Sequence, residues 1–135
     1  MRELRFRGIS LDTNEWVYGY GVVQNIEHNE ARIINSTGGN MMHNWDVKPE
    51  TVGQFIGLND NNGFDVYEGD ILNVNYSGHL MKEAVVFSTG GFKKSYLGDE
   101  NENHALPFTS LSSKNVEVIG NIHQHPHLLQ ETPSC

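Results

Sequence analysis

Cysteine and long apolar runs are nearly absent from this sequence of 135 residues. Its single cysteine, Cys135, cannot form an internal disulfide, and a thiol at a chain end is a poor catalytic nucleophile because chain ends are commonly mobile. No apolar run approaches the roughly 18 residues that a membrane-spanning helix needs. Residues 1–5 also lack the apolar core of a signal peptide. We therefore expect a cytoplasmic protein that does not enter a membrane.

Positive charge is also scarce. The chain has 9 Lys and Arg residues against 17 Asp and Glu residues, which gives a formal net charge of −8. This balance argues against broad binding to nucleic-acid backbones, where Lys and Arg must neutralise phosphates. The two short basic groups are Lys93-Lys94 and the N-terminal arginines Arg2, Arg5 and Arg7. Both are typical of solvated strand faces.

Proline is rare and glycine is frequent, with 4 and 14 residues respectively. Many turns and short apolar stretches at roughly 8–12-residue spacing predict a mainly β fold with little helix, an SH3-like roll or small barrel. Lys48-Pro49-Glu50 predicts a boundary between an N-terminal β extension (1–48), packed on the core, and a barrel core (49–135). The core would end in a short helical turn after Pro126. A single domain over 1–135 is the alternative.

The densest turn signal is the run from Gly57 to Leu72. Asn62-Gly63 tolerates the positive φ of a tight hairpin, and Glu68-Gly69-Asp70 predicts a second reversal. A calcium loop with Gly63 at its sixth position would place Leu58 first and Gly69 twelfth, and neither is a ligand. Calcium binding of this type is therefore excluded, and we expect Asp and Asn side chains to bond their own backbone.

This central run and the last predicted strand resemble the YopX-like family of phage and prophage proteins. The resemblance spans nearly the whole chain. It implies a β-rich fold with an SH3-like roll, in a family without an established biochemical role, and it supplies no catalytic residues. The segments that carry it are Arg5-Phe6-Arg7, Trp16–Gly19, Thr51–Leu58, Asn62-Gly63, Tyr67–Ile71 and Val118–Ile122, with Pro126 and Leu128-Leu129 downstream.

One pattern has the spacing of metal ligands. His123, His125 and His127 alternate, so in an extended segment they would face the same way and could share a zinc or nickel ion. Pro126 interrupts the extension, and His125-Pro126-His127 stands where the family usually shows Asn-Pro-Glu. We expect solvated histidines and no bound metal.

Catalytic motifs are missing. Glu68 and Asp70 flank Gly69 and could act as acid and base if buried together, but carboxylates beside a turn glycine usually bond the turn. The sequence has no nucleophile elbow, phosphate-binding loop or dinucleotide-binding glycine pattern. We expect no catalytic residues and no cofactor.

The leading hypothesis is a phage-derived, non-catalytic interaction module that associates with itself, because short strands with open edges are hidden most simply in this way. Its other partner, a host or phage protein, is left open. An aromatic stripe on a strand is also typical of the core side of a sheet. The candidate interface residues are Leu4, Phe6, Trp16, Tyr18, Tyr20 and Val22.

The alternative hypothesis is a nucleic-acid-binding accessory or regulatory protein of a phage, which small barrels often are. Strand alternation predicts that Phe92, Lys94 and Tyr96 share one face, whereas the net charge argues against this function. A third hypothesis is an acidic decoy that occupies a nucleic-acid-binding protein of the host. The candidate nucleic-acid face is Lys82, Phe92, Lys93, Lys94 and Tyr96.

Overall fold

The computed structural model describes residues 3–36, 42–88, 91–96, 106–107 and 113–129. These residues form a mainly β structure, as the sequence predicts, with three short 3₁₀ helices and no α-helix among them. The chain divides by its internal contacts into two compact units, which we call unit 1 (Met1–Phe55) and unit 2 (Ile56–Cys135). The sequence predicted a boundary after residue 48, and the division lies between Phe55 and Ile56.

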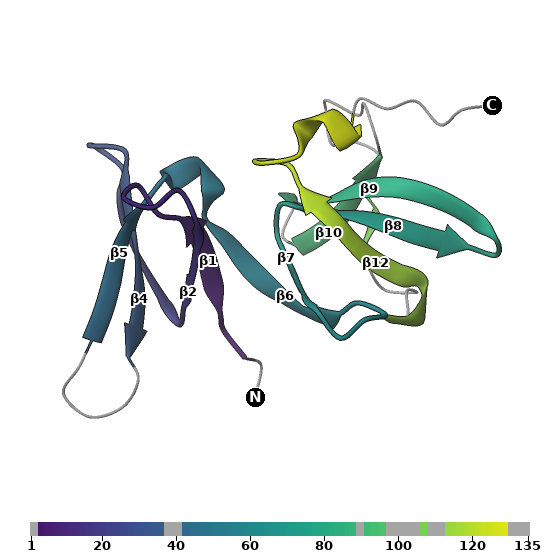
Figure 1. The fold of residues 1–135 in the computed structure, drawn as a ribbon, viewed down its shortest axis with the longest axis horizontal. Coiled ribbons are helices and arrows are strands. Elements are labelled where there is room, and N and C mark those ends of the chain that lie inside the picture. The colour runs from purple at the N-terminus through teal and green to yellow at the C-terminus, as the bar shows by residue number, and fades with distance from the viewer. Residues whose placement is uncertain (1–2, 37–41, 89–90, 97–105, 108–112, 130–135) are drawn as a thin grey trace. The chain divides into compact units, whose positions relative to one another are not determined.

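Unit 1 is built from short antiparallel strands (Figure 1). Strand β1 pairs with β2 on one side and with the first residues of β6 on the other, and β3, β4 and β5 form a separate three-stranded sheet. Their bounds are β1 Phe6–Ile9, β2 Trp16–Gly19, β3 Gly21–Asn25, β4 Glu30–Ser36, β5 Met42–Val47, the 3₁₀ helix η1 Pro49–Thr51, and β6 Gly53–Asn59.

The two sheets of unit 1 are tied together at both ends of the core. Between β2 and β3 the chain bends at Tyr20, whose N–H donates to the carbonyl of Ile34 on β4 at 2.9 Å. At the far end Ser10 forms an isolated antiparallel bridge with Val47 of β5. Apolar side chains fill the space between the sheets because each strand presents one face inwards. The buried core is Ala31, Ile33 and Val47, surrounded by Phe6, Val17, Val22, Trp45 and Val52.

Unit 2 contains a curled five-stranded antiparallel sheet in the order β11-β10-β9-β8-β12 (Figure 1). A bulge between Val118 and Gly120 shifts the pairing of β12 with β8. The core cluster is Val66, Leu72, Val74, Val85 and Val116. The bounds are β7 Asp65–Tyr67, β8 Asp70–Tyr76, β9 His79–Ser88, β10 Gly91–Tyr96, β11 Leu106–Pro107, η2 Ser113–Asn115, β12 Val116–Asn121 and η3 Pro126–Leu129.

The central run makes the two predicted reversals that lead from β6 through β7 to β8. Gly63 and Gly69 both have positive φ, +86° and +93°, which side-chain-bearing residues rarely adopt. Asp60 bonds the turn as expected: its Oδ1 accepts the N–H groups of Asn62 and Phe64, each at 2.9 Å. Its Oδ2 accepts the N–H of Val118, 58 residues further along, at 3.0 Å. The prediction of turn chemistry is confirmed at this residue, which also fastens the hairpin to β12.

Among the described residues, no helix is long and apolar enough to cross a membrane.

Candidate interaction surface

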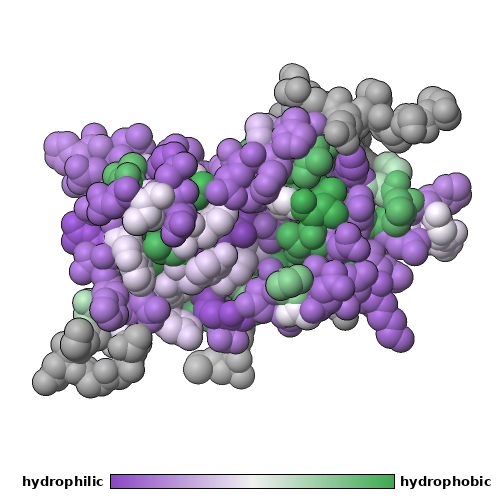
Figure 2. All heavy atoms as spheres, viewed as in Figure 1, coloured by the Kyte–Doolittle hydropathy of each residue, from purple (hydrophilic) through white to green (hydrophobic). Residues whose placement is uncertain are grey.

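Among the described residues, more of the exposed large apolar side chains belong to unit 1 than to unit 2. Figure 2 shows a visible surface that is mostly hydrophilic, on which the largest group of apolar residues lies over unit 2. In unit 1 the described residues with exposed large apolar side chains are Leu4, Leu11, Tyr18, Tyr20, Val23, Ile26 and Met42; in unit 2 they are Phe64, Leu80, Met81 and Phe87.

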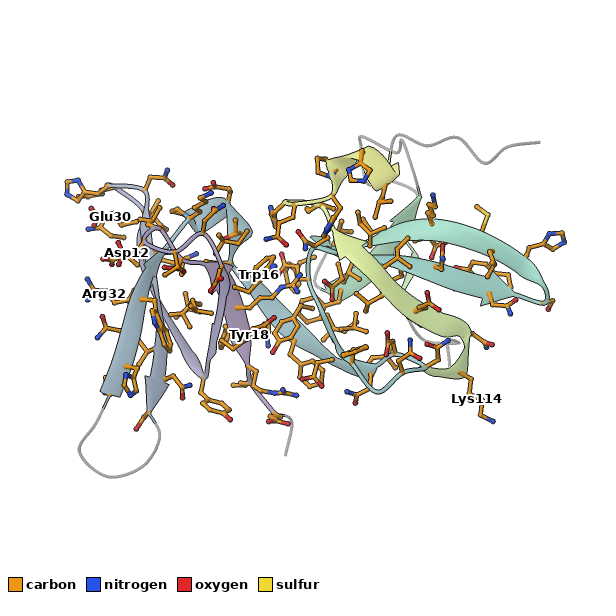
Figure 3. All side chains as sticks on the ribbon, viewed as in Figure 1. Asp12, Trp16, Tyr18, Glu30, Arg32 and Lys114 are labelled. Atoms are coloured by element: carbon orange, nitrogen blue, oxygen red, sulfur yellow. The ribbon has the colours of Figure 1, made fainter. Side chains whose placement is uncertain are left out.

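The six predicted interface residues have three different environments. Phe6 and Val22 pack against the core of unit 1. Trp16 is partly buried beneath the guanidinium of Arg7, whose Cζ lies 4.0 Å from the ring centroid. The side chains of Leu4, Tyr18 and Tyr20 are exposed; Figure 3 labels Trp16 and Tyr18 on β2. Leu4, Tyr18 and Tyr20 are therefore the exposed members of the predicted interface.

The set is divided because the stretch from Trp16 to Val23 is not one strand. It breaks at Tyr20 into β2, which pairs with β1, and β3, which pairs with β4. Uninterrupted alternation would place Trp16 and Val22 on one face, but alternation starts afresh after a bend.

Strand β3 is the open edge that the sequence argument missed. It is the outermost strand of the sheet β3-β4-β5, and its last three residues are all exposed, although they point to alternate faces. Val23 is 54% exposed, and the flanking Tyr20 and Ile26 are 59% and 88% exposed. The signal was present in the sequence, since the run from Tyr20 to Ile26 contains no charged residue and no proline.

A depression of about 140 Å³ lies on the same sheet and is lined by residues of all three of its strands. The register places Val23 opposite Arg32, and Arg32 opposite Asp46, in a row across the three strands. Arg32 Nε donates to Asp46 Oδ1 at 3.2 Å, and both side chains are more than half exposed. An exposed ion pair of this kind contributes little to stability. The lining residues are Val23, Asn25, Glu30, Ala31, Arg32 and Asp46, of which Figure 3 labels Glu30 and Arg32.

The predicted nucleic-acid face lies partly outside the described structure. The side chains of Lys93, Lys94 and Tyr96 are not among those described. The ring of Phe92 packs edge-on against Phe87, with centroids 5.3 Å apart. Lys82 is paired in register with Asn73 on β8.

The pairing of β10 with β9 shows which of these positions belong to the same face of the sheet. Positions 92, 94 and 96 pair with Phe87, Val85 and Glu83 of β9. Lys82 precedes Glu83, so it belongs to the opposite face of β9. Of the two described side chains in the predicted set, Lys82 therefore belongs to the face of the sheet opposite to that of Phe92.

Of the two carboxylates that flank Gly69, that of Asp70 bonds the turn. Asp70 is buried, and its Oδ2 accepts the N–H of Tyr67 at 2.8 Å. Gly69 itself bonds Val85 through its N–H and Ile122 through its carbonyl, each at 2.9 Å. Asp70 therefore stabilises the reversal into β8.

Another buried carboxylate, Glu83 of β9, was not anticipated from the sequence. It is 1% exposed and lies opposite Leu72 of the core, and the hydroxyl of Tyr76 donates towards its two oxygens, 2.9 Å from each. A lone Glu in a strand gives no sequence signal for burial, because the same residue type is common on solvated faces.

The three histidines of the metal-like pattern do not lie along one extended strand. The chain turns over residues 122–124, and η3 begins at Pro126. Nδ1 of His125 accepts the N–H of Asn121 at 3.2 Å, and the ring centroids of His125 and His127 are 6.2 Å apart. Within the described ranges, no group of three or more His, Cys, Asp or Glu residues is arranged to hold a metal ion.

A known protein family matches almost the whole of this chain. The family model described as YopX protein matches residues 5–130, from the start of β1 to the end of η3. The chain belongs to the YopX family. The resemblance inferred from the central run and the last strand is thereby confirmed.

A solved structure shares the fold. The crystal structure of protein EF1440 from Enterococcus faecalis is similar with a TM-score of 0.55 and 22% sequence identity, over 93% of this chain and 97% of that one. At this identity the similarity concerns the fold alone. Among curated proteins, no sequence matches the chain.

Proposed function

We propose that this YopX-family chain is a phage-derived, non-catalytic interaction module that associates first with copies of itself. The observation that carries the proposal is strand β3, beyond which no described strand pairs; it is uncharged and is accompanied by the exposed side chains of Tyr20, Val23 and Ile26. The phage origin rests on the family resemblance.

An open strand edge favours association for a simple reason. Its backbone N–H and C=O groups are strong hydrogen-bonding groups, and an added strand satisfies them in a geometry that the sheet already defines. Proteins that stay monomeric usually protect such an edge with lysine, proline or a bulge. Strand β3 carries neither lysine nor proline.

The distribution of charge supports the same proposal. Unit 1 has five basic and seven acidic residues, whereas unit 2 has four basic and ten acidic residues. Two copies can therefore bring their first units together against little net repulsion, while the acidic second units keep the assembly dispersed.

Nucleic-acid binding has weaker support. The basic residues proposed for it belong to unit 2, where acidic residues outnumber basic ones most strongly. Phosphate contacts would have to form against that local field.

Sedimentation equilibrium of the full chain at low and moderate salt tests the proposal. We expect a concentration-dependent dimer, with an association constant that changes little with salt because the edge is uncharged. A monomer at high micromolar concentration would refute self-association. Salt-dependent retention of the protein on filters with single- or double-stranded DNA would instead support the nucleic-acid alternative.

A further inference from the structure

We propose that two copies pair antiparallel through β3, about a twofold axis at Val23, so that the sheet β5-β4-β3 continues into β3-β4-β5 of the second copy. This inference rests on the proposed self-association and names its interface. The occupant of the open edge is thus the same strand of another copy of this chain.

The end of β3 projects beyond the core that its first half covers. Val22 packs against the core of unit 1, whereas Val23, Gln24 and Asn25 are exposed on both faces of the strand. A strand that is exposed on both faces and forms the last strand of its sheet is accessible to a partner strand.

Strand β5, the other edge of this sheet, is less suitable. Its C-terminal half is already occupied within unit 1, where Leu11 N–H donates to the carbonyl of Asp46 at 2.9 Å and Ser10 bridges Val47. It also carries the charge of Asp46. A negative charge on an edge strand opposes pairing with an identical strand when the two charges approach.

The twofold axis follows from the alternation of side chains. Residues opposite each other in an antiparallel pair point to the same face, so the axis must pass through a residue rather than between two. Centring on Val23 pairs all 5 residues of β3: Gly21 with Asn25, Val22 with Gln24, and Val23 with itself.

This register also brings together the apolar side chains of Tyr20 and Ile26, which flank β3. Tyr20 and Ile26 are equally far from Val23 in sequence, so Tyr20 of one copy comes beside Ile26 of the other. Both are among the exposed large hydrophobics of unit 1, and each would cover the other. Val23 of each copy would meet at the centre, a β-branched pair of the kind that stabilises neighbouring strands. On either side of that pair the row continues through Arg32 and Asp46 (Figure 3, where Arg32 is labelled).

Replacing Val23 with lysine tests the axis directly, because two ammonium groups would then lie opposite each other. We expect the dimer dissociation constant of Val23→Lys to rise by about a hundredfold, since like charges placed together in an interface cost several kcal/mol. The matched control is Met42→Lys on β5, since Met42 is 63% exposed and Val23 54%. The control should dimerise like the wild type in the same sedimentation experiment.

A charge exchange separates direct contact from misfolding. Val23→Glu alone should weaken the dimer for the same reason as Val23→Lys, and an equimolar mixture of the two variants should restore a heterodimer that is tighter than the dimer of either variant alone. A wild-type monomer would refute both this interface and the proposed self-association. A dimer that survives Val23→Lys, that is lost in Met42→Lys, or that the mixture fails to restore would refute the β3 axis while leaving self-association intact.

Discussion

The two units differ in what they bury and in what they leave open. Unit 2 buries three carboxylates, Asp60, Asp70 and Glu83. The buried polar residues described in unit 1 are Arg7, Ser10 and Thr51, with no carboxylate among them. Unit 1 instead exposes an uncharged strand at the edge of its sheet, β3.

The difference shows two ways of specifying a small β structure. In unit 2, buried acceptors hold particular N–H groups and fasten turns to distant strands, as Asp60 does for β12. Such contacts define one strand register, and removing an acceptor lowers the unfolding free energy strongly because buried N–H groups are left without a partner. In unit 1 a buried hydroxyl also holds a distant N–H group, since Thr51 Oγ1 accepts the N–H of Ile9 at 2.8 Å, but the sheets are otherwise held by apolar packing and close backbone approach. Strand β3 is the outermost strand of its sheet.

The largest expected effect concerns the turn of unit 2. Asp60→Ala removes the acceptor of three N–H groups from a site that is 4% exposed. We expect a loss of about 4 kcal/mol in unfolding free energy, since each buried donor left without a partner costs about 1–3 kcal/mol. Urea denaturation measures the unfolding free energy. The loss in Asp60→Asn should lie between zero and the loss in Asp60→Ala, because the amide keeps one carbonyl oxygen as an acceptor. A loss no greater than that of the exposed control Asp12→Ala would contradict the role of Asp60.

The next effect tests close backbone approach in unit 1. A Cβ on Gly19 would collide with the carbonyl oxygen of Ile34, whereas a Cβ on Gly21 would lie 3.8 Å from Cβ of Ile34, an ordinary contact. We expect Gly19→Ala to lower the unfolding free energy by about 3 kcal/mol and Gly21→Ala to be neutral or slightly stabilising. Amide hydrogen exchange should show protection lost in β4 and kept in β8. Equal losses in the two variants would be inconsistent with this packing.

A smaller effect is expected at the buried carboxylate of β9. Tyr76→Phe removes the hydroxyl that donates to Glu83, and we expect a loss of about 2 kcal/mol in unfolding free energy. The matched control is Thr13→Val in an exposed turn of unit 1, where the hydroxyl that is removed makes only an exposed 3.4 Å contact with the N–H of Glu15 and the loss should be near zero. If both variants unfold at the same urea concentration, the hydrogen bond to Glu83 does not stabilise unit 2.

The smallest effect concerns the ion pair on the open face of unit 1. Because Arg32 and Asp46 are both more than half exposed, we expect a coupling energy below about 0.5 kcal/mol in a double-mutant cycle of Arg32→Ala and Asp46→Ala. A coupling above about 1 kcal/mol would mean that the pair is far better ordered than its exposure implies.

Sequence reasoning succeeded where the signal is local. The reversals at Asn62-Gly63 and Glu68-Gly69-Asp70 depend on the φ preference of glycine and on side chains that bond their own backbone. The bond from Asp60 to Val118 could not be read in this way, because its partner lies 58 residues away.

The candidate interaction surface was predicted less completely, because it also depends on contacts between segments far apart in the chain. The stripe from Trp16 to Val22 alternates as one strand would, yet the bend at Tyr20 assigns its two halves to different sheets. Alternation says which residues share a face but not which face is covered, since that depends on which strands pair.

Composition and local patterns by themselves determined the β class, the turns of the central run and the family. These features arise from backbone preferences and short-range hydrogen bonds, which act within a few residues. Only the tertiary structure decided that Glu83 is buried, that Val22 faces a core, and that β3 is an open edge. Each of these depends on strands far apart in the chain, whose pairing is governed by the burial of the whole apolar surface rather than by any one segment.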